Sequence, residues 1–234
     1  MRQKHVVLMV QDFLAQDLLT TLRIRETEDG GYGKRFYVAA LYLSRFLIAR
    51  ATGAFAPRSK DVTIETPLCT TTTNIIVQND MTFVHVRRAG GVLADAAFGF
   101  FPHAHFGAID LHRDERTLEP IEGPYHNLPE SFAGQTVFIL DPMLATGGTA
   151  DWAIKRAKEL GATRIVFVGL VSAPRGFDFI RSNHPDVPIV LAARDPILNG
   201  VGYIEPGLGD MGDRLYGANH DEYGNPRGVV AAKA

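Results

Sequence analysis

The sequence predicts one α/β domain built around a parallel sheet, and three observations support that fold class. The chain has 234 residues, which is enough for one sizeable domain. From Met81 onward, apolar runs, glycine-containing turns and helical patterns alternate. The apolar runs are nearly continuous, which is typical of strands buried on both faces of a parallel sheet. We therefore expect residues 1–234 to form a single domain.

Two elements are predicted ahead of the alternating region. Asp12–Ile24 and Arg35–Ala49 carry apolar residues at helical spacing and are separated by a polar, glycine-containing segment, so we expect an N-terminal α-hairpin. Asp61–Thr66 and Thr72–Val77 are rich in β-favouring residues and are joined by a short turn. They predict a hairpin or projecting β-arm over residues 61–77.

The alternating region is predicted from its apolar periodicity. We expect its strands at Met81–Val86, Ala104–Leu111, Thr136–Leu140, Arg164–Val171 and Pro188–Ala193. We expect its helices at Val92–Phe100, Ala150–Leu160 and Phe177–His184, with Gly161 closing the second of them. The segment HRDERTLEP, residues 112–120, is expected to be a charged loop.

Regular signals fade after Asp195. Residues 200–217 contain six glycines, and we expect a long, tightly turned loop there rather than packing material. Loops of this kind inside compact domains usually serve a function. Residues 195–217 are therefore a candidate ligand-binding segment, followed by a tail at residues 218–234.

Composition excludes several classes of protein. The net charge of −2 argues against a general nucleic-acid or membrane-surface binder, so no partner of either kind is expected. The apolar run Val6–Val10 is too short for a signal peptide or a membrane span. Cys69 is the single cysteine, which rules out an intramolecular disulfide or a zinc cluster and favours the cytoplasm.

The segment Asp141–Thr149, DPMLATGGT, leaves a predicted buried strand and enters a predicted helix. It therefore lies at the carboxyl edge of the sheet, where open α/β folds bind ligands. Gly147 and Gly148 let a ligand approach the backbone, and the free amides of the helix start attract an anion. It is neither a nucleotide P-loop nor a dinucleotide fingerprint. A small phosphate ester fits it; the alternative is an ordinary connection with Asp141 as helix cap.

Two further segments can be interpreted either as ligand-binding segments or as ordinary structural ones. Arg87–Gly91 combines arginines with glycines and suits a diphosphate, but these residues alone favour an ordinary surface arginine pair before a helix, and Arg113 has the same ambiguity. The glycine-rich segment can present backbone groups to a flat polar ligand such as uracil. Cytosine would leave a buried mismatch costing about 1–3 kcal/mol. The loop alone does not identify the ligand. His103 and His105 have no supporting metal ligand and are read as strand and loop residues.

Taken together, these residues resemble the uracil phosphoribosyltransferases, which are type I phosphoribosyltransferases. The match is dense from about Arg88 to Gly217. It rests on Asp141-Pro142-Met143-Leu144-Ala145-Thr146-Gly147-Gly148-Thr149, on Gly202-Tyr203-Ile204 with Pro206-Gly207-Leu208-Gly209-Asp210, on Gly212-Asp213-Arg214, on Arg113-Asp114-Glu115 with Thr117-Leu118-Glu119-Pro120, and on Ala173-Pro174 and His184-Pro185-Asp186. It implies the type I fold, with residues 195–217 as a base-binding hood.

The resemblance also implies a reaction, in which uracil and phosphoribosyl diphosphate give UMP and diphosphate. By carry-over, Asp141, Arg88 and Asp210 are the catalytic residues. Phosphoribosyl diphosphate would be bound by Arg88, Arg113, Asp210 and Asp141, Pro142, Met143, Leu144, Ala145, Thr146, Gly147, Gly148 and Thr149. Uracil would be bound by Tyr203, Ile204, Gly209, Asp210 and Met211. Mg²⁺ would be carried by the diphosphate, with no protein metal site.

Departures from the family pattern leave alternatives open. Arg87 stands where the family has an apolar residue, Gly91 where it has leucine, and Met211 where it has alanine. One alternative is a non-catalytic homologue that senses UMP or phosphoribosyl diphosphate, and another is a transferase for a modified pyrimidine. The family further implies a homodimer or homotetramer, and GTP or another nucleotide is a possible effector.

Overall fold

The structure is a computed structural model that describes residues 7–10, 12–27, 30–55, 58–113 and 120–217. Its elements, in chain order, are β1 (Val7–Met9), α1 (Phe13–Arg23), α2 (Arg35–Ala54), β2 (Ser59–Glu65), β3 (Thr70–Ile76), a 3-10 turn (Gln78–Asp80), β4 (Met81–Arg87), α3 (Gly91–Phe100), β5 (His105–Arg113), β6 (Pro120–Asn127), β7 (Thr136–Leu140), β8 (Met143–Leu144), α4 (Gly148–Glu159), β9 (Arg164–Val168), β10 (Val171–Ser172), α5 (Pro174–Asn183), β11 (Ile189–Leu191), β12 (Ala193–Arg194), β13 (Ile197–Leu198), β14 (Ile204–Glu205) and α6 (Met211–Tyr216).

A seven-stranded sheet with the strand order β1-β11-β9-β7-β4-β5-β6 forms the centre of the molecule. All its neighbouring strands are parallel except β5 and β6. The apolar run Thr136–Leu140 is entirely buried in the middle of this sheet. The mostly parallel α/β sheet predicted from the sequence is therefore confirmed.

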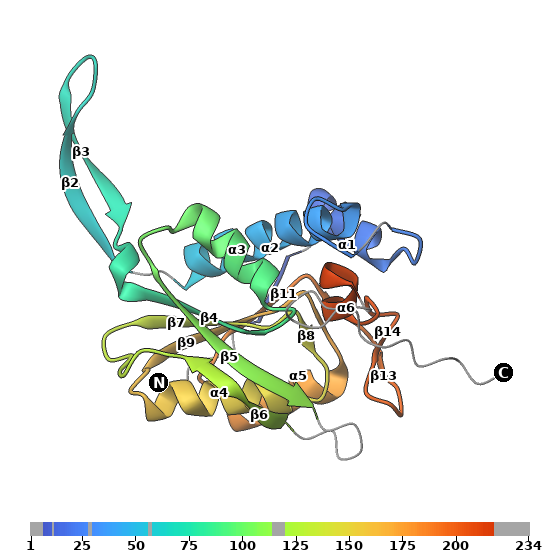
Figure 1. Ribbon diagram of the computed structural model, residues 1–234. Coiled ribbons are helices and arrows are strands. Elements are labelled where there is room, and N and C mark those ends of the chain that lie inside the picture. The colour runs from blue at the N-terminus through green and yellow to red at the C-terminus, as the bar shows by residue number, and fades with distance from the viewer. Residues whose placement is uncertain (1–6, 11, 28–29, 56–57, 114–119, 218–234) are drawn as a thin grey trace.

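Helices cover both faces of the sheet (Figure 1). One buried cluster joins α1, α2 and α3 to the sheet, with Phe83 and Phe138 stacked at 4.9 Å between ring centroids. The other cluster places α4 and α5 on the opposite face, where Ile154 and Phe177 are buried. The two layers hold the carboxyl ends of the central strands in fixed register, so the loops that follow these strands are well supported.

The N-terminal α-hairpin and the β-arm are both present. Helix α2 extends five residues beyond the predicted end, to Ala54. Strands β2 and β3 pair antiparallel from Ser59↔Ile76 to Glu65↔Thr70 and project from the body of the molecule (Figure 1). Almost every residue of the arm is exposed, including Leu68 at its tip.

Three predictions about the sheet were incomplete. Strand β6 was not predicted, because its glycine and proline hide a strand that pairs only at the sheet edge. The run Arg164–Val171 is two strands, divided at Gly169, where a Cβ atom would lie 2.7 Å from the Asp141 carbonyl oxygen. The run Pro188–Ala193 is likewise divided into β11 and the start of β12.

The prediction that residues 200–217 are a loop rather than packing material was wrong. The segment contains β14 and α6, and the side chains of Ile204, Leu208, Met211 and Leu215 are buried in the core beside α1 and α2. Glycines that allow sharp turns alternate here with apolar anchors. These four side chains thus fix the hood to the core. The tail predicted at residues 218–234 lies outside the described residues.

Candidate active site

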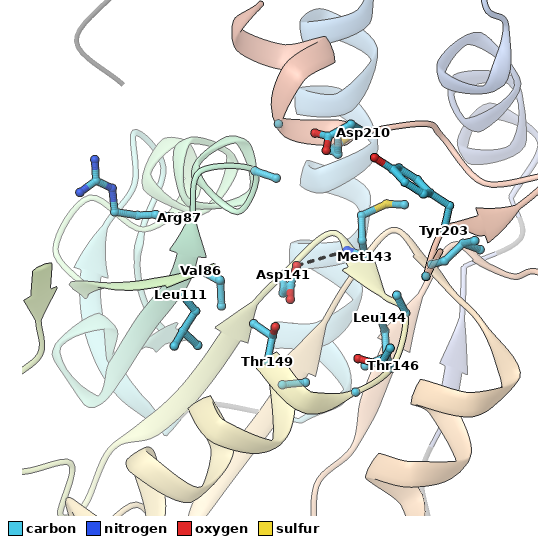
Figure 2. A pocket seen from close by; sticks show the side chains of 18 of the residues that line it. Val86, Arg87, Leu111, Asp141, Met143, Leu144, Thr146, Thr149, Tyr203 and Asp210 are labelled. Atoms are coloured by element: carbon cyan, nitrogen blue, oxygen red, sulfur yellow. Dashed lines mark hydrogen bonds between the residues drawn. The ribbon is translucent and has the colours of Figure 1, made fainter. Parts of the chain in front are cut away.

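A cavity of about 260 Å³ opens at the carboxyl edge of the central strands. Three segments that are far apart in the sequence surround it: the end of β4 and the turn after it, the loop from β7 to α4, and the hood (Figure 2). Its lining residues are Val86, Arg87, Ala89, Leu111, Asp141, Met143, Leu144, Ala145, Thr146, Gly147, Thr149, Ala150, Gly202, Tyr203, Ile204, Gly209, Asp210, Met211 and Gly212. The topology therefore brings the predicted phosphate and base segments together.

The loop from β7 to α4 has the backbone geometry of an anion cradle. Gly147 has φ +93° and caps α4, and a Cβ atom there would lie 2.9 Å from the Phe179 ring. The Thr146 hydroxyl accepts a long hydrogen bond, 3.5 Å, from the Gly148 N–H. Gly147, Thr149 and Ala150 at the start of α4 line the cavity, so the positive end of the helix dipole lies beside it. An anionic group fits this position.

Asp141 follows β7 directly and faces the cavity (Figure 2). Its Oδ1 atom accepts a hydrogen bond of 3.3 Å from the Met143 N–H. It does not cap α4, so the alternative reading of Asp141 as helix cap is wrong. Burial raises the pKa of its carboxyl to about 6, and the hydrogen bond from Met143 opposes part of that effect. The carboxylate is available to accept hydrogen bonds from a ligand.

The turn after β4 presents Arg87 and Arg88 differently. Arg87 lines the cavity edge, but its guanidinium turns away from Asp141 and lies 5.1 Å from the centre of the Tyr125 ring (Figure 2). Arg88 does not line the cavity. Its Nη2 donates to Asp213 Oδ1 over 2.8 Å, which joins the turn to α6.

Gly91, at the end of the same turn, has little room for a side chain. A Cβ atom at Gly91 would lie 2.8 Å from the Tyr216 hydroxyl oxygen. A larger residue in this position requires that the hydroxyl group move. Gly91 and Tyr216 therefore fit each other, and they join the start of α3 to the end of α6.

The hood contributes Gly202, Tyr203, Ile204, Gly209, Asp210, Met211 and Gly212 to the cavity wall. Ile204 is buried, while Tyr203 is 42 % exposed at the cavity mouth. Asp210 caps α6 by accepting the Asp213 N–H at 2.9 Å, and its side chain is exposed on the cavity side. Gly209, with φ +70°, lets the chain turn between these residues.

The predicted site residues fall into three groups. Twelve line the cavity: Asp141, Met143, Leu144, Ala145, Thr146, Gly147, Thr149, Tyr203, Ile204, Gly209, Asp210 and Met211. Pro142, Gly148 and Arg88 lie beside it without lining it. Arg113 ends β5, and its side chain and the residues 114–119 of the family-like motif lie outside the described residues.

Sequence reasoning missed several lining residues. Val86, Leu111 and Ala150 are apolar residues at strand or helix ends, and their sequence gives no chemical signal. Gly202 and Gly212 lie in the recognised hood but were not singled out as site residues. Only the topology of the sheet brings them to the cavity.

The fold and the site together define a phosphoribosyltransferase of type I: a mostly parallel sheet, an amide cradle after a central strand, and a hood over the strand ends. A family model described as uracil phosphoribosyltransferase matches residues 9–218. The chain belongs to the uracil phosphoribosyltransferase family.

Individual relatives agree with that assignment. The chain is 41% identical over 212 residues to the uracil phosphoribosyltransferase of Dictyoglomus thermophilum, covering 91% of this chain and 99% of that one. It is 42% identical over 158 residues to the uracil phosphoribosyltransferase of Thermus thermophilus, covering 68% and 76%. A solved structure of a protein from Aquifex aeolicus is similar, with a TM-score of 0.83 and 30% identity over 91% of this chain and 99% of that one.

Proposed function

We propose that the protein transfers the phosphoribosyl group of 5-phospho-α-D-ribose 1-diphosphate to N1 of uracil, giving UMP and diphosphate. Family membership supports the reaction. The observation that carries the proposal is the position of Asp141, which faces a cavity bordered by an amide cradle on one side and the hood on the other. The cavity thus offers adjacent places for a phosphate, a ribose and a flat base.

The ribose 5-phosphate occupies the cradle from Thr146 to Thr149, where helix amides and hydroxyl groups donate to its oxygens. Asp141 accepts hydrogen bonds from the ribose hydroxyl groups in its ionised form, which predominates at neutral pH because its pKa is about 6. Pro142, Met143, Leu144 and Ala145 shape the wall between these two contacts.

The diphosphate lies toward the turn after β4. Arg88 and Arg113 bind its oxygens, and Arg88 exchanges Asp213 for the anion when the substrate enters. Asp210 faces the ribosyl group from the hood. The positive charges of Arg88 and Arg113 would neutralise the negative charge of the leaving diphosphate.

Uracil binds to the hood through the backbone of Ile204 and of Gly209–Met211, with Tyr203 at the entrance. The bond from C1′ to the diphosphate oxygen breaks with oxocarbenium character, the bond from C1′ to N1 forms, and the N1 proton leaves to solvent. The protein contributes position and electrostatic stabilisation rather than a covalent step.

Mg²⁺ is part of this proposal as an ion carried by the substrate. Within the described ranges, no group of three or more His, Cys, Asp or Glu side chains is arranged to hold a metal. Asp141 is the single carboxylate at the end of β7, which fits an ion held by diphosphate oxygens and water more than by the protein. When bound, the ion neutralises charge on the leaving diphosphate.

The assembly and location are further parts of the proposal. The exposed β-arm has little to pack on within one chain, and an isolated two-stranded ribbon is marginally stable in water. We expect a second copy to cover it, in a homodimer or homotetramer. No helix in the described ranges has the length and apolar character of a membrane span. Cys69 is a free, exposed thiol, which suits the cytoplasm.

The test is a turnover assay with phosphoribosyl diphosphate, Mg²⁺ and one base at a time. UMP formation from uracil supports the proposal. Turnover with a substituted pyrimidine but not uracil would favour the modified-base alternative, for which the buried Met211 beside the cavity is the relevant residue. Binding of UMP without turnover would favour a sensing role, and addition of GTP to the assay tests for a nucleotide effector.

A further inference from the structure

A partly buried ion pair that lies outside the cavity contacts the hood. Arg23, in the last turn of α1, makes a two-pronged contact with Asp195: Nη1 donates to Oδ2 over 2.8 Å and Nη2 donates to Oδ1 over 2.7 Å. The Asp195 side chain is only 5% exposed and that of Arg23 is 24% exposed. Neither residue lines the cavity. A charge pair this well shielded and this well oriented constrains whatever it contacts.

The pair contacts the turn of the hood at Gly207. Asp195 Oδ2 accepts the Gly207 N–H at 2.9 Å, and Arg23 Nη1 donates to the Gly207 carbonyl oxygen over 3.0 Å. Both polar groups of this peptide position are therefore bound. Asp195 is itself anchored to the sheet, because its N–H donates to the Ser172 carbonyl oxygen over 2.8 Å.

Gly207 lies directly against the backbone of Ile204, a residue that lines the cavity. Its φ is +56°, and a Cβ atom there would lie 2.0 Å from the Ile204 carbonyl oxygen. Ile204 and Gly209, on either side of it, line the cavity. The Gly207 and Ile204 backbones are therefore in close contact, and we expect a shift of one to affect the other.

A second arginine ties the same turn to α1. The Arg214 guanidinium donates to the Leu208 carbonyl oxygen and also to those of Leu22 and Ile24 at the end of α1. The carbon of that guanidinium lies 4.0 Å from the centre of the Phe36 ring. The N-terminal α-hairpin thus contacts the hood at two places, Gly207 and Arg214.

We propose that Arg23 and Asp195 are positioning residues for base recognition: from outside the cavity they fix the Ile204–Gly209 backbone that reads the base. The inference rests on the proposed function. A site that recognises a base through backbone carbonyl and amide groups needs a fixed backbone to be selective. A backbone that can shift can also form hydrogen bonds to a wrong base. We call the Arg23–Asp195 pair the clamp. It should therefore affect the binding of the base and not that of phosphoribosyl diphosphate, whose predicted contacts lie mainly in the cradle and the turn after β4.

Arg23→Lys is the decisive variant, since it keeps the charge but loses the planar fork. We expect the KM for uracil to rise on the order of ten-fold, while the KM for phosphoribosyl diphosphate stays within about two-fold of wild type. Asp195→Asn should raise the KM for uracil further. If Asp195→Asn does not fold, Arg23→Lys decides alone.

The matched control is Arg50→Lys. Arg50 also pairs with an aspartate of the α1 region, Asp12, through Nη2 contacts of 3.1 and 3.2 Å, but at the opposite end of α1 and away from the hood. Both KM values should be unchanged in this variant. A purely structural role for Arg23 would lower the melting temperature and leave the ratio of the two KM values as in wild type, and that result overturns the proposal.

Amide hydrogen exchange of residues 204–209 supplies a readout that does not depend on turnover. The clamp predicts faster exchange there in Arg23→Lys and wild-type exchange in Arg50→Lys. A wild-type protein that forms no UMP refutes the proposed function. Normal wild-type turnover with unchanged exchange and an unchanged uracil KM in Arg23→Lys refutes the clamp alone.

Discussion

Replacing Asp141 with asparagine should stabilise the ligand-free protein while removing most of its activity. Burial raises the pKa of the Asp141 carboxyl from 3.8 to about 6. The folded protein therefore holds this proton more tightly than the unfolded chain does. Stability is lost as pH rises from about 4 to about 6 and is not regained above that range. Asparagine keeps the shape of the side chain without a charge to bury.

The size of the effect follows from the pKa difference. One pKa unit corresponds to about 1.4 kcal/mol. The interval from 3.8 to about 6 then corresponds to about 3 kcal/mol at neutral pH. Because the cavity opens to water, part of that cost is screened, and we expect a gain of about 1–3 kcal/mol in the free energy of unfolding for Asp141→Asn.

Urea unfolding of the two proteins at several pH values measures this gain. The difference should be full near pH 7.5 and much smaller near pH 4, where the wild-type carboxyl is mostly protonated in the folded state. In parallel, kcat/KM for phosphoribosyl diphosphate should fall on the order of 100-fold, since charged hydrogen bonds to the ribose are lost. An asparagine variant that is less stable at neutral pH, or whose advantage does not depend on pH, would refute the account of Asp141 as a buried carboxylate.

Four further outcomes are expected. The kcat/KM of the wild-type protein should decline below about pH 6 as Asp141 becomes protonated, and this limb should be missing from the pH profile of Asp141→Asn. Gly91→Ala should lower the melting temperature because of the contact with the Tyr216 hydroxyl, and Tyr216→Phe should restore it in the double variant; an additive double variant would exclude that contact. Chelation of Mg²⁺ should abolish turnover, while calorimetry should find tight Mg²⁺ binding only when diphosphate is present. Deleting arm residues 61–74 should shift the sedimentation of the protein to that of a single chain, and an unchanged oligomer would show that another face carries the assembly.

The elements with strong local patterns were predictable from the sequence. Thr136–Leu140 is apolar at nearly every position because both of its faces are covered, and Arg35–Ala49 carries apolar residues at helical spacing within the longer α2. The cradle at Asp141–Thr149 was also predictable in position, since a glycine-rich turn between a buried strand and a helix has few other places in such a fold.

What depends on distant contacts was not predictable. Strand β6 exists because β5 offers it an edge, and Gly169 divides a continuous apolar run because the Asp141 backbone passes close to it. The hood looked like a loop because its buried residues are spaced by glycines rather than by a regular period. The orientation of Arg88 toward Asp213 likewise depends on α6, which no local pattern near Arg88 indicates.

The proposed recognition of the base through the hood backbone affects how base preference can be changed by mutation. Side chains that point away from a ligand can be exchanged freely as long as the main chain keeps its path, so the site tolerates sequence drift at many of its own positions. We expect substitutions at Tyr203, which lies at the cavity mouth, to alter the entry of the base more than its hydrogen bonds. A library intended to produce a new base preference should therefore vary the turn around Gly207 and its supports, and leave the cavity wall as it is.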